Sequence, residues 1–134
     1  MPPKTPAPPT RYKVLLVDDD SSVLKSMAAA LEFDFDVTSC NSAARALELL
    51  RNGDFHVVCS DYSMPGMTGI ELLQQASALP QPMGCLLVTG SSVFIGSKSD
   101  ADYYVLVKPV DPERLGALIL QLARTAEVKR GAKR

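Results

Sequence analysis

The hydrophobic residues of this chain follow a strand-like spacing and a helix-like spacing in turn. Short apolar runs predict buried strands, and segments with an apolar residue at every third or fourth position predict helices that face a core. The predicted strands cover residues 13–17, 36–40, 55–60, 85–88 and 103–107. The predicted helices cover residues 21–32, the segment between a cap at Asn41 or Ser42 and Gly53, residues 69–78, and the stretch that opens at Asp111 and Pro112.

Strands that alternate with helices indicate a parallel sheet covered on both faces, because parallel neighbours need crossover connections. The crossovers in such sheets are right-handed. The five strands and their intervening helices therefore predict an α/β doubly wound fold with a parallel sheet. Ligands of these folds bind beyond the carboxyl ends of the strands. We therefore expect the functional residues at that edge of the sheet.

Several helix positions can be predicted individually. Gly53 is expected to end the second helix in the left-handed conformation. In the third helix, Ile70 and Leu73 are expected to face the core, with Leu72 as a further candidate. The last helix presents one apolar stripe, made of Leu115, Leu118, Ile119 and Leu122.

Three of the apolar runs end at charged residues. Asp18, Asp19 and Asp20 follow the first strand, Asp61 follows the third, and Lys108 follows the fifth. Carboxylates at one sheet edge repel one another and are stable together only with a cation or a proton between them. Taken alone, the three consecutive aspartates fit a turn with a helix N-cap as well as they fit a functional site. Their place in register with the other strand ends favours a site for a divalent metal and a phosphate.

Composition limits the range of functions. A chain of 134 residues with 46% hydrophobic content can form one domain and is too short for two. A formal net charge of −1 gives no reason to expect direct nucleic-acid binding. No segment has the pattern of a membrane span or a signal peptide, so we expect a cytoplasmic protein without membrane insertion. The expected organisation is a disordered Pro-rich tail at residues 1–11, a domain at 12–124 and a basic tail at 125–134.

The cysteines and the histidine are expected to be structural. Cys40, Cys59 and Cys85 lack the spacing of metal ligands and lie near predicted strands, which favours buried, reduced thiols. His56 starts a predicted strand and is expected to be a structural residue rather than a phosphocarrier.

Four motifs carry a resemblance to a known family. In chain order, VLLVDDD, VVCSDYSMPGMTGIELL, LLVTGSS and VLVKPV resemble the CheY-like receiver domain of two-component response regulators. The resemblance covers residues 12–124 and implies a flavodoxin-like fold with strand order 2-1-3-4-5. It implies Asp61 as the phosphorylated residue. It also implies four ligands of Mg²⁺, namely Asp18, Asp19, Asp61 and the backbone carbonyl of Ser63. It also implies that Thr89 and Lys108 bind the phosphoryl group, with a cis peptide before Pro109.

The resemblance further implies a phosphoacceptor rather than a dedicated enzyme. Its donor would be a histidine kinase or a histidine phosphotransfer protein, and it would lose the group by autodephosphorylation. Signalling would proceed by phosphorylation-dependent binding to a downstream protein, or by a phosphorelay. A stand-alone receiver, a receiver excised from a hybrid histidine kinase or larger regulator, and a pseudo-receiver binding module all fit the sequence. A remote alternative is a haloacid-dehalogenase-like phosphatase, in which Asp18 and Asp20 would be nucleophile and acid.

The chain also departs from the usual receiver pattern. The aromatic switch position is Val105, and strand alternation allows only one of Tyr103 and Tyr104 to share its face. Residues between Thr89 and Lys108 favour turns, so the fourth helix of the family is expected to be brief or absent. The positions that tune hydrolysis hold Ser63 and Ser91, whose small side chains should admit water. Ala117 and Leu120 lie off the stripe of the last helix and could form the surface of a homodimer.

Overall fold

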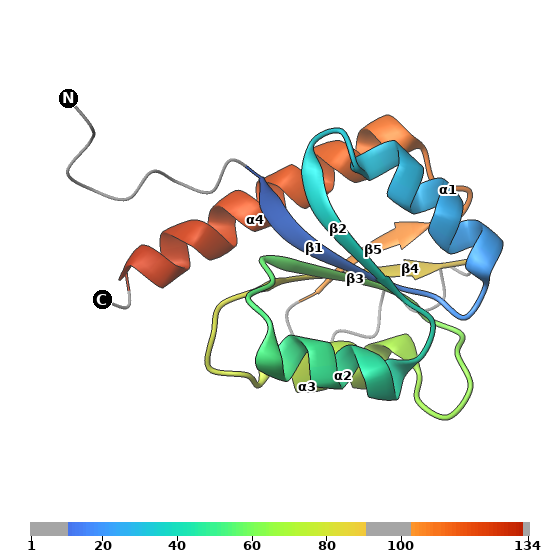
Figure 1. The fold of residues 1–134 in the computed structure, drawn as a ribbon, viewed down its shortest axis with the longest axis horizontal. Helices are drawn as coiled ribbons and strands as arrows, with labels where there is room; N and C mark the ends of the chain where they lie inside the picture. The colour runs from blue at the N-terminus through green and yellow to red at the C-terminus, as the bar shows by residue number, and fades with distance from the viewer. Residues whose placement is uncertain (1–10, 91–102, 133–134) are drawn as a thin grey trace.

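The computed structural model of the protein describes residues 11–90 and 103–132. Within these ranges the chain forms a parallel sheet with strand order β2-β1-β3-β4-β5, covered by four helices (Figure 1). The strands are β1 (Tyr12–Val17), β2 (Phe35–Cys40), β3 (Val57–Asp61), β4 (Gly84–Thr89) and β5 (Tyr104–Val107). The helices are α1 (Ser21–Leu31), α2 (Ala43–Asn52), α3 (Gly69–Ser77) and α4 (Pro112–Ala132). The fold class and strand order expected from the sequence are confirmed.

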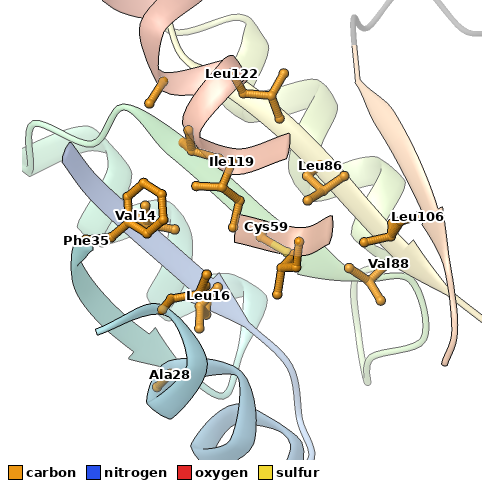
Figure 2. Packing of buried hydrophobic residues seen from close by; sticks show 14 of the residues in the cluster. Val14, Leu16, Ala28, Phe35, Cys59, Leu86, Val88, Leu106, Ile119 and Leu122 are labelled. Atoms are coloured by element: carbon orange, nitrogen blue, oxygen red, sulfur yellow. The ribbon is translucent and has the colours of Figure 1, made fainter. Parts of the chain in front are cut away.

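Helices cover both faces of the sheet, and successive strand residues point to opposite faces. In β1, Val14 and Leu16 belong to the core layer beneath α1 and α4, whereas Leu15 and Val17 belong to the layer beneath α2 and α3. Burial on both faces explains why the central strands are continuous apolar runs. Figure 2 shows the first layer, with the labelled residues Val14, Leu16, Ala28, Phe35, Cys59, Leu86, Val88, Leu106, Ile119 and Leu122.

Most ends of the elements lie within one residue of the predicted ends, but the start of β3 and the end of α4 differ by more. Phe55 and His56 precede this strand instead of forming its first residues, and the strand includes Asp61. Ser42 caps α2, and its hydroxyl accepts a hydrogen bond from the Arg45 N–H at 3.2 Å. The described residues contain no helix long and apolar enough to cross a membrane.

Gly53 ends α2, but the expected left-handed conformation is wrong. Its φ of −104° and ψ of 174° are extended values that other residues also adopt. A Cβ at this position would lie 2.7 Å from the Leu49 carbonyl oxygen and 2.7 Å from the Phe55 ring. Glycine is therefore required by the close approach of Phe55 to the helix end and not by the sign of φ.

The buried stripe of α3 differs from the expected one. Leu72, Leu73 and Ala76 are fully buried, whereas Ile70 is only partly buried. Together with Gly69, the three buried residues follow the spacing i, i+3, i+4, i+7 of one helix face. Ile70 lies beside this stripe, so its apolar side chain packs only against the edge of the core.

The stripe of α4 also shifts along the helix. Leu118 is only partly buried, and Ala123 and Ala126 continue the buried face toward the C-terminus. Of the two residues expected to form a dimer surface, Ala117 is exposed and Leu120 packs partly against the core. Leu120 is therefore partly used inside the domain, which reduces the apolar surface available to a second copy.

The expected basic tail at 125–134 is wrong for residues 125–132. These residues continue α4 to Ala132, with Ala126 buried against the domain. Arg130 donates hydrogen bonds to the backbone oxygens of Phe55 and Pro82, which lie far from it in the sequence. These partners, which the local pattern does not reveal, extend the packed helix beyond residue 124.

Candidate functional site

The carboxyl ends of the strands bring the charged residues of the sequence together. Asp18 directly follows β1, Asp61 ends β3, Thr89 ends β4, and Lys108 directly follows β5. The registers of the sheet place these ends side by side, because Val17 pairs with Ser60, Asp61 with Val88, and Thr89 with Val107. The N–H of Lys108 continues the last ladder and donates to the Thr89 carbonyl oxygen at 2.8 Å.

Three carboxylates form an acidic cluster at this edge. Asp18, Asp19 and Asp61 each offer an oxygen atom, and these atoms all lie within 4.8 Å of one another. Asp18 and Asp61 are buried, whereas Asp19 is exposed. Burial raises the pKa of Asp18, and the charge of Asp61 adds to this rise against the hydrogen bond from the Asp20 N–H. Such a set of hard oxygen donors fits a divalent cation such as Mg²⁺, which would offset the repulsion between them.

Lys108 provides the positive charge at the cluster. Its Nζ lies 2.8 Å from Asp61 Oδ1, with the lysine side chain 37% exposed and that of Asp61 9% exposed. Burial lowers the pKa of Lys108, but the hydrogen bond and charge of Asp61, together with the charge of Asp18, outweigh burial and raise it. Lys108 is therefore a cation at neutral pH, beside the carboxylate of Asp61.

Asp20 has a different role from its two neighbours. Its carboxylate caps α1, accepting hydrogen bonds from the Ser22 N–H at 2.9 Å, the Ser22 hydroxyl at 2.7 Å and the Val23 N–H at 3.4 Å. Its own N–H donates to Asp18 Oδ1 at 2.9 Å and so fixes the orientation of that carboxylate. The turn-and-cap interpretation of the acidic run is thus correct for Asp20. The phosphatase alternative, which needs Asp20 as an acid beside Asp18, is not supported.

The loop after β3 shapes the surroundings of Asp61. The N–H of Ser63 donates to Asp61 Oδ2 at 3.1 Å, so both carboxylate oxygens of Asp61 have a partner. The loop closes where the Gly69 N–H donates to the Tyr62 carbonyl oxygen at 2.8 Å. Thr68 and Glu71 then begin α3 with reciprocal side-chain-to-backbone hydrogen bonds.

Gly69 is a site residue whose importance the sequence reasoning missed. A Cβ at this position would lie 2.2 Å from the Asp61 carbonyl oxygen and 2.8 Å from Leu87 Cδ1. Only glycine allows α3 to begin this close to the end of β3. The available signal was a glycine at the first position of a helix, where it has no advantage from helix propensity.

Comparison with known proteins then decides the family. A family model described as the response regulator receiver domain matches residues 14–120. The chain belongs to the response regulator receiver family. This receiver is 37% identical over 121 residues to the C4-dicarboxylate transport transcriptional regulatory protein DctD of Rhizobium meliloti, covering 87% of this chain and 25% of DctD. It is 34% identical over 101 residues to the response regulator receiver protein CpdR of Brucella abortus, covering 72% of this chain and 84% of CpdR.

A solved structure supports the same assignment. The receiver resembles a CheY-like response regulator receiver domain protein from Methanospirillum hungatei JF-1 with a TM-score of 0.75 and 31% identity. That comparison covers 89% of this chain and 98% of the other. Because this receiver spans only a quarter of the length of DctD, the activities of the full-length regulator do not transfer to it directly.

The remaining family positions can now be located in the receiver. Lys108 and Pro109 are joined by a cis peptide, as the resemblance implied. Val105 is partly buried and packs with Tyr103 against the core layer beneath α2 and α3, whereas Tyr104 is exposed. Tyr103 is therefore the tyrosine that shares a face with Val105. Ser91 and the segment of the expected fourth helix lie outside the described residues.

Proposed function

We propose that this receiver accepts a phosphoryl group on Asp61 in a Mg²⁺-dependent reaction, with a histidine kinase or a histidine phosphotransfer protein as the donor. The pairing of Lys108 Nζ with Asp61 Oδ1 at 2.8 Å, beside the carboxylates of Asp18 and Asp19, carries the proposal. These residues place a nucleophile, a fixed cation and a set of metal-binding oxygens at one sheet edge. Phosphoryl transfer needs mainly positioning and charge neutralisation, which this arrangement supplies.

The chemical step follows from the residue types. A carboxylate oxygen of Asp61 attacks the phosphorus, and the bond from phosphorus to the donor nitrogen breaks, leaving its electron pair on the donor imidazole. The product is an acyl phosphate, and a carboxylate nucleophile needs no general base to form it. Asp18, Asp19, Asp61 and the Ser63 carbonyl would hold Mg²⁺, which when bound would neutralise charge on the phosphoryl oxygens.

Lys108 and Thr89 would bind the transferred group. The lysine loses its carboxylate partner when Asp61 is phosphorylated and can pair with a phosphoryl oxygen instead. Thr89 ends the neighbouring strand at the same edge and would hydrogen-bond another oxygen. Ser63 is exposed and small, so water would reach the acyl phosphate and the receiver would dephosphorylate itself. In this proposal the protein is a phosphoacceptor and not a dedicated enzyme.

The output would be a change in protein binding or a further phosphoryl transfer. In a cytoplasmic protein, the phosphorylated receiver would bind a downstream target or pass its group along a phosphorelay. Relatives such as DctD carry transcriptional regulation in their names, and CpdR is named as a receiver protein. Both a stand-alone receiver and a receiver within a larger regulator fit this proposal.

The first test is incubation with acetyl phosphate and Mg²⁺, followed by intact mass measurement. We expect one added phosphoryl group, lost in Asp61→Asn and without Mg²⁺. Asp20→Asn is the matched control, because it removes a nearby carboxylate outside the cluster and keeps an amide oxygen that can cap α1. This variant should be phosphorylated like the wild type. Modification that persists in Asp61→Asn, or no modification of the folded wild type, would contradict the proposal.

A further inference from the structure

A second set of charged residues lies at the amino-terminal ends of the strands, opposite the end of the sheet that carries Asp61. Figure 1 shows the red C-terminal part of α4 extending past the end of the sheet at which β1 begins. Gly84, at the start of β4, lets the helix approach closely, because a Cβ there would lie 2.7 Å from Leu122 Cβ. Beyond this contact, Ala126 is still buried. The last turns of α4 are therefore docked on the domain.

Arg130 makes the most extensive contacts of this helix end. Its guanidinium donates to Asp54 Oδ1 at 2.9 Å, to the Pro82 carbonyl oxygen at 3.2 Å and to the Phe55 carbonyl oxygen. Gln81 donates to the same Asp54 oxygen at 2.6 Å. The Arg130 side chain is only 11% exposed, whereas that of Asp54 is 63% exposed. Through Arg130, the end of α4 is hydrogen-bonded both to the residues just before β3 and to the loop before β4.

His56 lies beneath this helix end in a defined protonation state. It is 4% exposed, and its Nδ1 accepts a hydrogen bond from the Lys13 N–H at 3.1 Å. Its Nε2 lies 3.3 Å from Glu127 Oε2, and its ring meets the edge of Tyr12 at a centroid distance of 5.0 Å. Since Nδ1 accepts, the neutral ring carries its proton on Nε2 and donates it to Glu127.

The charges around His56 oppose one another. Burial lowers the pKa of His56, and the guanidinium of Arg130 lowers it further, whereas Asp54 and Glu127 raise it without restoring the ordinary value. From β1, the ammonium of Lys13 lies over the Phe55 ring at 5.1 Å from its centroid, and Tyr12 contributes a neutral ring. A second proton would have to enter at Nδ1, where the Lys13 N–H already points.

We propose that residues 126–132 form a pH-sensitive latch, which stays docked while His56 is neutral and is released when His56 binds a proton. Protonation removes the acceptor of the Lys13 N–H and places an imidazolium near the Arg130 guanidinium in a buried site. Undocking of the helix end exposes the imidazole to water and separates the two cations. Glu127 keeps an attraction for the ring, which limits the release without reversing its direction.

The size of the effect follows from proton linkage. In the open latch, the histidine recovers its ordinary pKa of 6.5, while in the docked latch the pKa is lower. The free energy that favours the docked form is fully present above pH 6.5. It decreases as the pH falls from 6.5 toward the lower pKa that His56 has in the docked form. The population of the open latch should therefore rise by up to about tenfold between pH 7.5 and 5.5.

The test is hydrogen exchange and NMR on the complete chain. His56 is the single histidine of the sequence, so its ring resonances report one titration without overlap. We expect it to titrate below pH 6.5, and protection factors of residues 126–132, corrected for the intrinsic pH dependence of exchange, to fall by up to about tenfold over the same range. Amides of α2 serve as the internal reference and should not change.

Two variants separate a latch from a merely structural contact. His56→Asn keeps an acceptor for the Lys13 N–H and cannot titrate, so protection of 126–132 should become independent of pH. If this variant does not fold, Glu127→Gln provides the second measurement, because it keeps an acceptor for Nε2 and removes the charge that favours the imidazolium. Its loss of protection at low pH should be at least as large as in the wild type. Unchanged protection of 126–132 down to pH 5.5 in the wild type, or a His56 pKa of 6.5 or higher, would refute the latch.

Discussion

Replacement of Gly69 by alanine should disturb the phosphoacceptor site through a steric clash of known size. The added Cβ would lie 2.2 Å from the Asp61 carbonyl oxygen, whereas ordinary contacts begin at 3.4 Å, so backbone atoms must separate by about 1.2 Å. The neighbouring atom belongs to the main chain of β3, which is buried and cannot move aside like a flexible side chain. Forcing extra volume into such a position costs roughly 1–3 kcal/mol or more of the free energy of unfolding.

The same displacement should also slow the phosphorylation of Asp61, even in molecules that remain folded. A misplacement of about 1 Å at reacting groups can reduce a rate roughly 100-fold. Urea unfolding measures the loss of stability, and the rate of acetyl phosphate labelling, followed by intact mass at saturating Mg²⁺, measures the effect on Asp61. Labelling must be compared under conditions in which the variant remains folded.

Two other glycines provide controls for the same substitution. Gly116 lies within α4, and a Cβ there would meet only Leu31 Cδ2 at 3.9 Å, so Gly116→Ala should stabilise the fold by up to about 1 kcal/mol. Gly66 has a φ of +83° and open space around it, so Gly66→Ala should cost roughly 1–2 kcal/mol through strain alone. A Gly69→Ala variant with wild-type stability and labelling rate would refute the steric reasoning.

Three further predictions concern single side chains. Burial raises the pKa of Asp18 above its ordinary 3.8. The protonated Asp18 side chain therefore contributes fully to the free energy of unfolding below pH 3.8, and this contribution is lost as the pH rises through the pKa of Asp18 in the folded protein. Asp18→Asn should therefore raise the Tm of the metal-free protein at pH 7 and abolish the gain in Tm on adding Mg²⁺, in calorimetry with and without the ion. Asp20→Ala should lose roughly 1 kcal/mol of unfolding free energy, because Ser22 and Val23 lose their cap, and Asp20→Asn should recover most of it. Burial raises the pKa of Cys59 to about 12, so at pH 8 about one molecule in ten thousand carries its thiolate. The other two cysteines are also buried. A thiol reagent should therefore label the native protein far more slowly than the urea-unfolded protein.

Much of the fold was predictable because its strands are buried on both faces. Such strands appear in the sequence as continuous apolar runs, and in β1 and β3 an aspartate marks the end of the run. The lysine after β5 could be placed in the same way. Once the strands were known to be parallel, these residues had to share one edge, and the registers confirm this for Asp61 and Thr89.

The remaining features depend on contacts that a local pattern does not show. Gly53 and Gly69 are required by the approach of Phe55 and of Asp61, so their role becomes visible only when the elements are packed. The separate roles of Asp18 and Asp20 depend on where α1 begins within a run of three identical residues. The basic end of the chain resembles a solvated tail, because the oxygens that bind Arg130 come from residues 48 to 76 positions away.

Strand β3 connects the two charged regions, with His56 just before its first residue and Asp61 at its end. All five of its residues are buried, and the residues between its two ends carry no charge at neutral pH, because burial raises the pKa of Cys59 to about 12. At one end Lys108 pairs directly with Asp61, and at the other end Arg130 pairs with Asp54. Neutralising His56 permanently in His56→Asn should therefore leave Mg²⁺-dependent labelling of Asp61 unchanged while it removes the pH dependence of the latch. Failure of the latch test would leave the phosphoacceptor proposal intact, and loss of labelling in Asp61→Asn would say nothing about the latch.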